Sequence, residues 1–230
     1  MSTAIPVLDR IFGGGLPSGS VVYVRADVQA MAEIFLYQFT QARKTYYFSN
    51  QRNPKHICRD IQNLVFDTED ITFMDLHSEY HLTPSGDVVN NLGDELMDTR
   101  IVEFTEYNLK KLMEKPEEDI NIIIDSFSFF MNLNVKPGIF KRLIYNIYET
   151  TKQLNCLTFL YGIKGFNKGE LETEILNSSD VIFDIELKMG TDRITSYLSI
   201  PKIRGKHPMT EMIKFKIENG IKIDTSQNIA

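Results

Sequence analysis

The sequence predicts an α/β fold: a mostly parallel, twisted sheet flanked by helices and extended by antiparallel strands near the C-terminus. Two observations predict it. Up to about residue 179, short β-branched or aromatic runs alternate with longer segments of helical period. Beyond that point strand-like runs follow one another with only turns between them, which indicates antiparallel pairing.

The expected elements follow from these patterns in chain order. Proline at positions 54 and 137 suits a first helical turn, where the missing N–H does no harm. Strands are expected at 21–24, 45–49, 71–76, 120–125 and 157–162, and helices at 30–42, 54–65, roughly 91–114 and 137–154. Four further strands, at 181–187, 194–203, 211–217 and 221–224, are expected to join the sheet as antiparallel additions.

Length and composition place the chain among ordinary globular proteins. It has 230 residues, 43% of them hydrophobic and 24% charged, and no obvious linker or repeat, so we expect one domain spanning 1–230. The net charge of −6 gives no general attraction to nucleic acid or anionic membranes. No long apolar run or secretory signal pattern is present, so a cytoplasmic location without membrane contact is expected. Cys58 and Cys156 are expected to be reduced packing residues.

Four stretches carry a resemblance to a known family. The run IPVLDRIFGGGLPSGSVV at 5–22 resembles the segment before the first strand in the KaiC/RadA-like branch of the RecA superfamily of P-loop ATPases. The similarity continues through YFSNQRNP at 47–54, IIIDSFS at 122–128 and IPKIRGKHP at 200–208. The resemblance implies a RecA-like core.

The resemblance also implies a phosphate-binding loop of the GxxxxGK[ST] type after the first strand, and here that loop is degenerate. Ala26 and Met31 stand at the two glycines, Ala32 at the lysine and Glu33 at the hydroxyl residue that binds magnesium. Glycine is needed where backbone N–H groups approach phosphate closely, and lysine supplies the cation. Glu33, with Asp27 in the loop, would repel phosphate instead.

Two interpretations of these acids remain open. Asp27 and Glu33 can replace the phosphate by satisfying the free N–H groups and the dipole at the helix N-terminus. Alternatively, both are solvated surface acids.

Two further positions bear on catalysis. Gln51 and Arg52 occupy the places of the Glu-Glu pair that activates water in ATPases of this resemblance, and an amide cannot act as a general base. Asp125 stands at the magnesium-associated aspartate of the family, but an aspartate that ends a buried strand commonly hydrogen-bonds a neighbouring loop. We therefore expect Ala32, Glu33 and Asp125 to be vestigial, with no catalytic residue and no cofactor.

Lys202 and Arg204 match a Lys-x-Arg pair that, in hexameric relatives, reaches the γ-phosphate held by the neighbouring subunit. They are therefore candidates for an interface in trans, although they also fit the solvated side of a strand.

Two weaker signals lie after other strands. His77 and His81 are four residues apart, but the surrounding residues suggest a loop, so no metal site is expected. The loop from Lys164 to Lys168 can contact single-stranded DNA through its lysines and Phe166, although the glutamates that follow favour a solvated loop.

The resulting hypothesis is a non-catalytic, KaiC-like pseudo-ATPase that acts as a regulatory or assembly subunit. Its partner is expected to be a protein, either a second copy or an active paralogue whose nucleotide site it completes. The alternatives are a recombination or repair accessory that binds single-stranded DNA, and a divergent ATPase.

Overall fold

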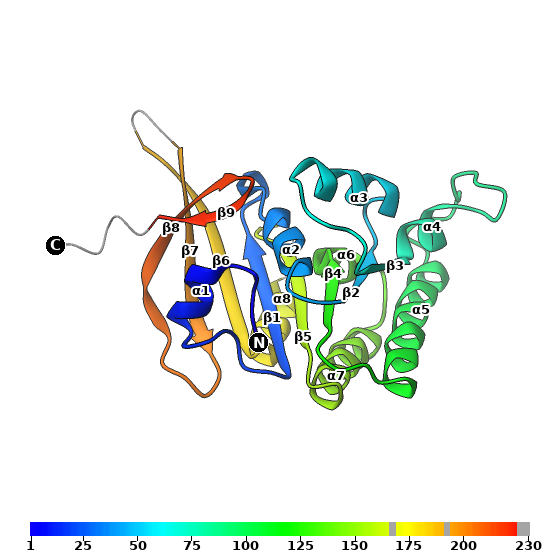
Figure 1. Ribbon diagram of the computed structural model, residues 1–230. Coiled ribbons are helices and arrows are strands. Elements are labelled where there is room, and N and C mark those ends of the chain that lie inside the picture. Colours follow the sequence, from blue (N-terminus) through cyan, green and yellow to red (C-terminus); the bar gives the residue numbers. More distant parts are fainter. Residues whose placement is uncertain (166–168, 191–193, 225–230) are drawn as a thin grey trace.

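The computed structural model describes residues 1–165, 169–190 and 194–224, and within these ranges nine strands form one twisted sheet (Figure 1). Their order across the sheet is β3-β2-β4-β5-β1-β6-β7-β8-β9. The strands are β1 Ser20–Ala26, β2 Thr45–Ser49, β3 Ile71–Asp75, β4 Asn121–Asp125, β5 Leu157–Ile163, β6 Val181–Met189, β7 Ile194–Ile203, β8 Met209–Glu218 and β9 Gly220–Ile223.

The described helices comprise four that the sequence analysis expected and four that it did not. The expected ones are α2 Glu33–Thr40, preceded by the short 3-10 helix η1 Val28–Ala30, and α3 Pro54–Asn63, α5 Glu95–Glu114 and α7 Pro137–Gln153. The additional ones are α1 Pro6–Ile11, α4 Leu76–His81, α6 Phe127–Asn132 and α8 Gly169–Ser178. Three of these four have six residues, which is too short to show a helical period in the sequence.

The predicted fold class is confirmed, with one difference in pairing. Strands β3, β2, β4, β5, β1 and β6 are all parallel, and β7, β8 and β9 continue the sheet antiparallel. The expectation that the strand at 181–187 is an antiparallel addition was wrong, because β6 lies parallel to β1 and antiparallel only to β7. Helix α8 before β6 allows this parallel crossover.

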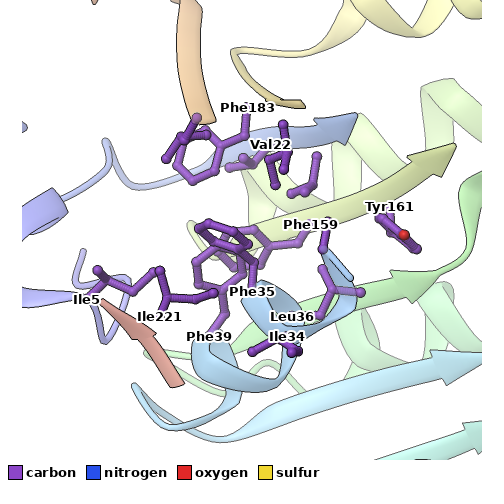
Figure 2. Close-up of a cluster of buried hydrophobic side chains, with 14 of the residues drawn as sticks. Ile5, Val22, Ile34, Phe35, Leu36, Phe39, Phe159, Tyr161, Phe183 and Ile221 are labelled. Atoms are coloured by element: carbon purple, nitrogen blue, oxygen red, sulfur yellow. The ribbon is translucent and has the colours of Figure 1, made fainter. Parts of the chain in front are cut away.

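Helices cover both faces of the sheet and define two apolar cores. One face packs against α1, α2, α3 and the β8–β9 hairpin, with Phe35, Phe39, Phe159 and Phe183 at its centre (Figure 2). The rings of Phe39 and Phe159 stack with centroids 4.2 Å apart. The other face packs against α4, α5, α6, α7 and α8. Cys156 is buried in this second core, and Cys58 is half-buried.

Gly162 on β5 shows how closely the parallel strands and their side chains fit. A Cβ atom placed there would lie 2.1 Å from the Tyr23 hydroxyl oxygen, and Tyr23 is fully buried on the neighbouring strand β1. Only glycine therefore leaves room for this tyrosine.

We expect Gly162→Ala to lower the free energy of unfolding by about 2 kcal/mol or more, because Tyr23 has no space to move into in the packed core. Urea denaturation measures this. The matched control is Gly138→Ala in α7, where a Cβ meets nothing within 4 Å. This control should leave stability unchanged or raise it by about 0.5 kcal/mol, and equal losses in both variants would contradict the packing argument.

Candidate functional site

The loop between β1 and α2 lies at the carboxyl end of the parallel strands, where ligands of open α/β sheets bind. Its inward-facing residues are apolar: Ala26, Ala30 and Ala32 are buried in the core beneath α2. Met31 adopts a left-handed backbone (φ 48°, ψ 40°) and points outward, with 54% of its surface exposed. Methyl groups thus face the core at positions of this loop where a phosphate loop has a glycine or the lysine that contacts phosphate.

Asp27 is held by β6 rather than by the start of α2. Its backbone N–H donates to the Ile185 carbonyl (3.2 Å), and its carboxylate accepts from the Leu187 N–H (3.0 Å). Lys164 lies 3.7 Å from the same carboxylate. Neither interpretation of Asp27 was right, because the residue neither caps the helix nor stands free in solvent.

Glu33 does occupy the first turn of α2, where a negative charge is favourable. Burial raises the pKa of Glu33, while its own backbone N–H and the nearby Arg52 act in the opposite direction. Its carboxylate is half-buried. Of the two acids, Glu33 alone lies in the first turn of α2.

Asp125, at the end of β4, is buried and bound by side chains from two neighbouring segments. The Tyr47 hydroxyl donates to its carboxylate (2.6 Å), and an Arg52 guanidinium nitrogen lies 3.5 Å from the same oxygen. Burial raises the pKa of Asp125, and the contacts with Tyr47 and Arg52 oppose that rise. The carboxylate at the magnesium-associated position is therefore engaged within the chain.

Arg52 connects the other members of this group. Besides Asp125, its guanidinium contacts Asp60 of α3 (3.0 Å) and donates a hydrogen bond to the Tyr37 hydroxyl of α2. Tyr161 lies farther along β5 than the aromatic cluster (Figure 2). It is close to this group, because burial and then the charges of Glu33 and Asp125 raise its pKa. We call Arg52, Asp125, Tyr37, Tyr47 and Asp60 the Arg52 network.

Sequence reasoning missed this network. It treated Arg52 only as the loss of a catalytic carboxylate, although a cation three residues beyond a strand end can face the neighbouring strand ends of a parallel sheet. Because β2 and β4 end at the same edge of the sheet, an ion pair between Arg52 and Asp125 could have been predicted from that arrangement.

Lys202 and Arg204 lie at the opposite edge of the sheet and make contacts within the chain. Lys202 donates to the carbonyl groups of Leu176 (2.7 Å) and Asn177 (3.0 Å) at the end of α8. Arg204 donates to the Asn177 carbonyl and pairs with Asp180 (2.9 Å). Both cations therefore cap a helix C-terminus, while 53% of the Arg204 side chain remains exposed.

Lys164 is surrounded by carboxylates. It pairs with Asp184 and lies 3.7 Å from Asp27 and 3.5 Å from Glu186, and only 15% of its side chain is exposed. A lysine neutralised in this way has little charge to offer a DNA backbone. Phe166 and Lys168, the other members of that predicted DNA contact, lie outside the described residues.

His77 and His81 lie on helix α4, so the expected loop was wrong at this point. Asp75 stabilises the helix start by accepting from the Ser78 N–H (2.8 Å). The two imidazole rings stack with centroids 4.7 Å apart. In the described ranges, no group of three or more histidine, cysteine or acidic side chains is placed to hold a metal ion.

The chain matches the protein family described as "Family of unknown function (DUF7125)" over residues 1–107 and 98–230. The chain belongs to this family. No curated protein matches it significantly.

Two solved structures share the fold of this DUF7125 member. The KaiC-like protein PH0186 from Pyrococcus horikoshii superposes with a TM-score of 0.71 at 15% identity, covering 97% of this chain and 98% of that one. The flagellar accessory protein FlaH from Methanocaldococcus jannaschii gives 0.68 at 15% identity, covering 95% of each. The chain thus has a KaiC-like RecA fold. Across the residues described, no helix is long and apolar enough to cross a membrane.

Replacing Arg52 with methionine should destabilise the protein by about 1–3 kcal/mol at neutral pH, because Asp125 then stays buried without its cation. The loss should shrink in acid, since a carboxyl group with a raised pKa becomes protonated and neutral there. Chemical denaturation at several pH values measures both effects.

Two further variants control this test. Arg59→Met alters an exposed arginine on helix α3, which follows Arg52, and should change stability little. Adding Asp125→Asn to Arg52→Met should recover part of the loss in a double-mutant cycle. Additive losses would contradict a direct Arg52–Asp125 interaction.

Acid should loosen helix α4. Burial, and then the neighbouring His81, lower the pKa of His77 below its usual 6.5 in the folded protein. Its neutral form therefore favours folding, and that contribution is lost as the pH falls below about 6.5. His77→Gln should reduce the fall in Tm between about pH 7.5 and pH 5.5, whereas His207→Gln, at an exposed turn, should not.

Proposed function

We propose that this protein is a non-catalytic member of the RecA-like fold that acts as a regulatory or assembly subunit without binding ATP. The Arg52 network carries the proposal. A guanidinium, two carboxylates and two tyrosine hydroxyls fill the carboxyl ends of β2 and β4, where a magnesium–nucleotide complex would need free ligands.

The charges around this place also oppose a triphosphate. Within the described part of the chain, Glu33, Asp60 and Asp125 surround one cation, Arg52, which is already paired. A phosphate loop normally provides a lysine and converging backbone N–H groups, and here the corresponding position is the buried methyl group of Ala32. Each of these differences weakens phosphate binding.

An assembly role agrees with the likeness to FlaH, which is described as a flagellar accessory protein, and to a KaiC-like protein. The partner is a second copy or an active paralogue. Of the two residues suggested for a contact in trans, Arg204 is the better placed, because half of its side chain is exposed, whereas Lys202 is directed at the end of α8. The DNA-binding and divergent-ATPase alternatives lack comparable support, since Lys164 and Asp125 are both engaged within the chain.

Calorimetric titration of the purified protein with ATP and Mg²⁺ tests the proposal. We expect no binding tighter than about 1 mM, because among the residues that the structure describes no free cation and no glycine loop faces the site. Micromolar binding that Asp125→Ala abolishes would overturn it and return ATP sensing or hydrolysis to first place.

A reversal experiment sharpens the result. The double change Ala32→Lys, Glu33→Thr restores the lysine and hydroxyl of a phosphate loop. We expect it to destabilise the protein, because position 32 is buried in the apolar core. It should not restore ATP binding, because Asp125 remains in its ion pair with Arg52. Gln29→Lys, at an exposed position of the same loop, is the matched control and should leave stability unchanged.

A further inference from the structure

Helix α5 lies on the side of the molecule away from the β8–β9 hairpin, and it packs against α4 and α7 (Figure 1). Its outward face is one exposed stripe whose residues recur every three or four positions, as they do on one side of a helix. The stripe comprises Leu96, Arg100, Glu103, Tyr107, Lys110, Lys111 and Glu114. Leu96 is 71% exposed and Tyr107 is 54% exposed, so two large apolar side chains on this face lack cover.

The charges of this stripe are arranged symmetrically about Tyr107. Glu103 lies four residues before Tyr107 and Lys111 four residues after it. Arg100 lies seven residues before Tyr107 and Glu114 seven residues after it. In both pairs the two charges are opposite, so the stripe is electrostatically complementary to a reversed copy of itself.

Two α5 helices that cross antiparallel at Tyr107 use this complementarity. Each residue then lies opposite the residue at the same distance on the other side of the crossing point. Glu103 of one copy faces Lys111 of the second copy, and Arg100 faces Glu114. A twofold axis through the crossing point repeats both ion pairs, which makes four in all.

A hollow beside Tyr107 accommodates the aromatic ring at the crossing point. It opens between α5 and α7 with a volume of about 380 Å³, and its lining includes the buried Leu109 and Thr150 and the half-buried Met113. Tyr107 also lines this hollow, so the Tyr107 ring of a second copy at the axis lies directly over it. Tyrosine is among the residues that dominate binding energy at the centre of protein interfaces.

The charged residues of the stripe are only weakly engaged within their own chain. Arg100 lies 3.6 Å from Glu79, and 65% of the Arg100 side chain remains exposed. Lys111 lies over the Tyr107 ring, with its ammonium nitrogen 4.5 Å from the ring centroid. Exposed ion pairs stabilise a fold little, so a second copy can engage these side chains at small expense to the monomer.

We infer that the chain forms a symmetric dimer in which α5 of one copy packs antiparallel on α5 of a second copy, with each Tyr107 over the α5–α7 hollow of the other. This inference rests on the assembly role proposed above and names the surface through which a second copy is the partner. Both copies use the same surface, so the contact is isologous and closes at two copies. Because the interface is small and rich in charge, we expect a Kd on the order of 10 µM.

Analytical ultracentrifugation of the full chain at about 1–200 µM tests this inference. We expect a monomer–dimer equilibrium without larger species. Tyr107→Asp should weaken the dimer at least tenfold, as expected for a central interface residue. The matched control is Tyr145→Asp on α7, which alters a tyrosine that is 61% exposed but lies outside the stripe, and it should leave the dimer unchanged.

Charge reversal at two exposed positions decides the geometry. Glu103→Lys places two lysines opposite each other across the axis, and Lys111→Glu places two glutamates there, so each variant alone should dimerise at least tenfold more weakly. An equimolar mixture of the two variants restores opposite charges at both contacts, and it should form a mixed dimer with nearly native affinity. The double variant Glu103→Lys, Lys111→Glu should also recover dimerisation.

A native chain that stays monomeric at 200 µM overturns the inference. A dimer that tolerates Tyr107→Asp, or a mixture that pairs no better than its components, overturns it as well. The calorimetric result keeps this failure distinct from failure of the proposed function. A monomer that does not bind ATP leaves the proposed function standing with a paralogue as partner, whereas ATP binding removes that function whatever the oligomeric state.

Discussion

Asp125 imposes the constraint on which the candidate site depends: a carboxylate buried at the end of a central strand must be compensated from within the protein. An uncompensated buried charge is unfavourable by several kcal/mol. Tyr47 and Arg52 compensate it, and Arg52 in turn is oriented by Tyr37 and Asp60. Side chains from β2, α2 and α3 are thereby tied to β4 at one point.

The strand order makes this compensation possible. Strand β4 lies between β2 and β5, and Ser49 pairs with Asp125 in register, so the segment after β2 begins beside the carboxylate. Arg52 lies three residues beyond Ser49, before α3 begins at Pro54. A chain crossing from β2 to α3 therefore delivers its side chains to the end of β4, whether the sheet binds a nucleotide or not.

Much of the fold could be predicted from the sequence, because hydrophobic residues recur with a different spacing in strands and in helices. Long elements repeat that spacing often enough for it to be recognised. Strands β2 and β7 have the expected bounds, and helix α7 differs by one residue. The short helices could not be predicted, and α4 was mistaken for a loop because Asp75, Ser78 and the stretch 83–86 have the residue types of turns. The parallel pairing of β6 with β1 depends on the connection from β5 through α8, and the local sequence pattern of β6 does not indicate the direction of this strand.

The site was predictable in position but not in its contacts. The resemblance to KaiC/RadA-like ATPases located the altered loop and Asp125, and the structure places both at the carboxyl ends of parallel strands. It could not show that Asp27 binds β6, that Lys164 is neutralised by Asp184, or that Lys202 caps α8, because these partners are distant in sequence. Long-range ion pairs depend on sheet order, which a one-dimensional pattern does not contain.

These contacts balance the charges at the carboxyl edge of the sheet within the chain. In a nucleotide-dependent protein, the ligand's phosphates and metal supply charges that the strand ends must match. Here Arg52 compensates Asp125, Lys164 compensates Asp27 after β1 and Asp184 on β6, and the alanines of the loop extend the apolar core. The chain itself therefore supplies the charges that this edge requires, while the apolar side chains of Val28 and Met31 are exposed on its outer surface.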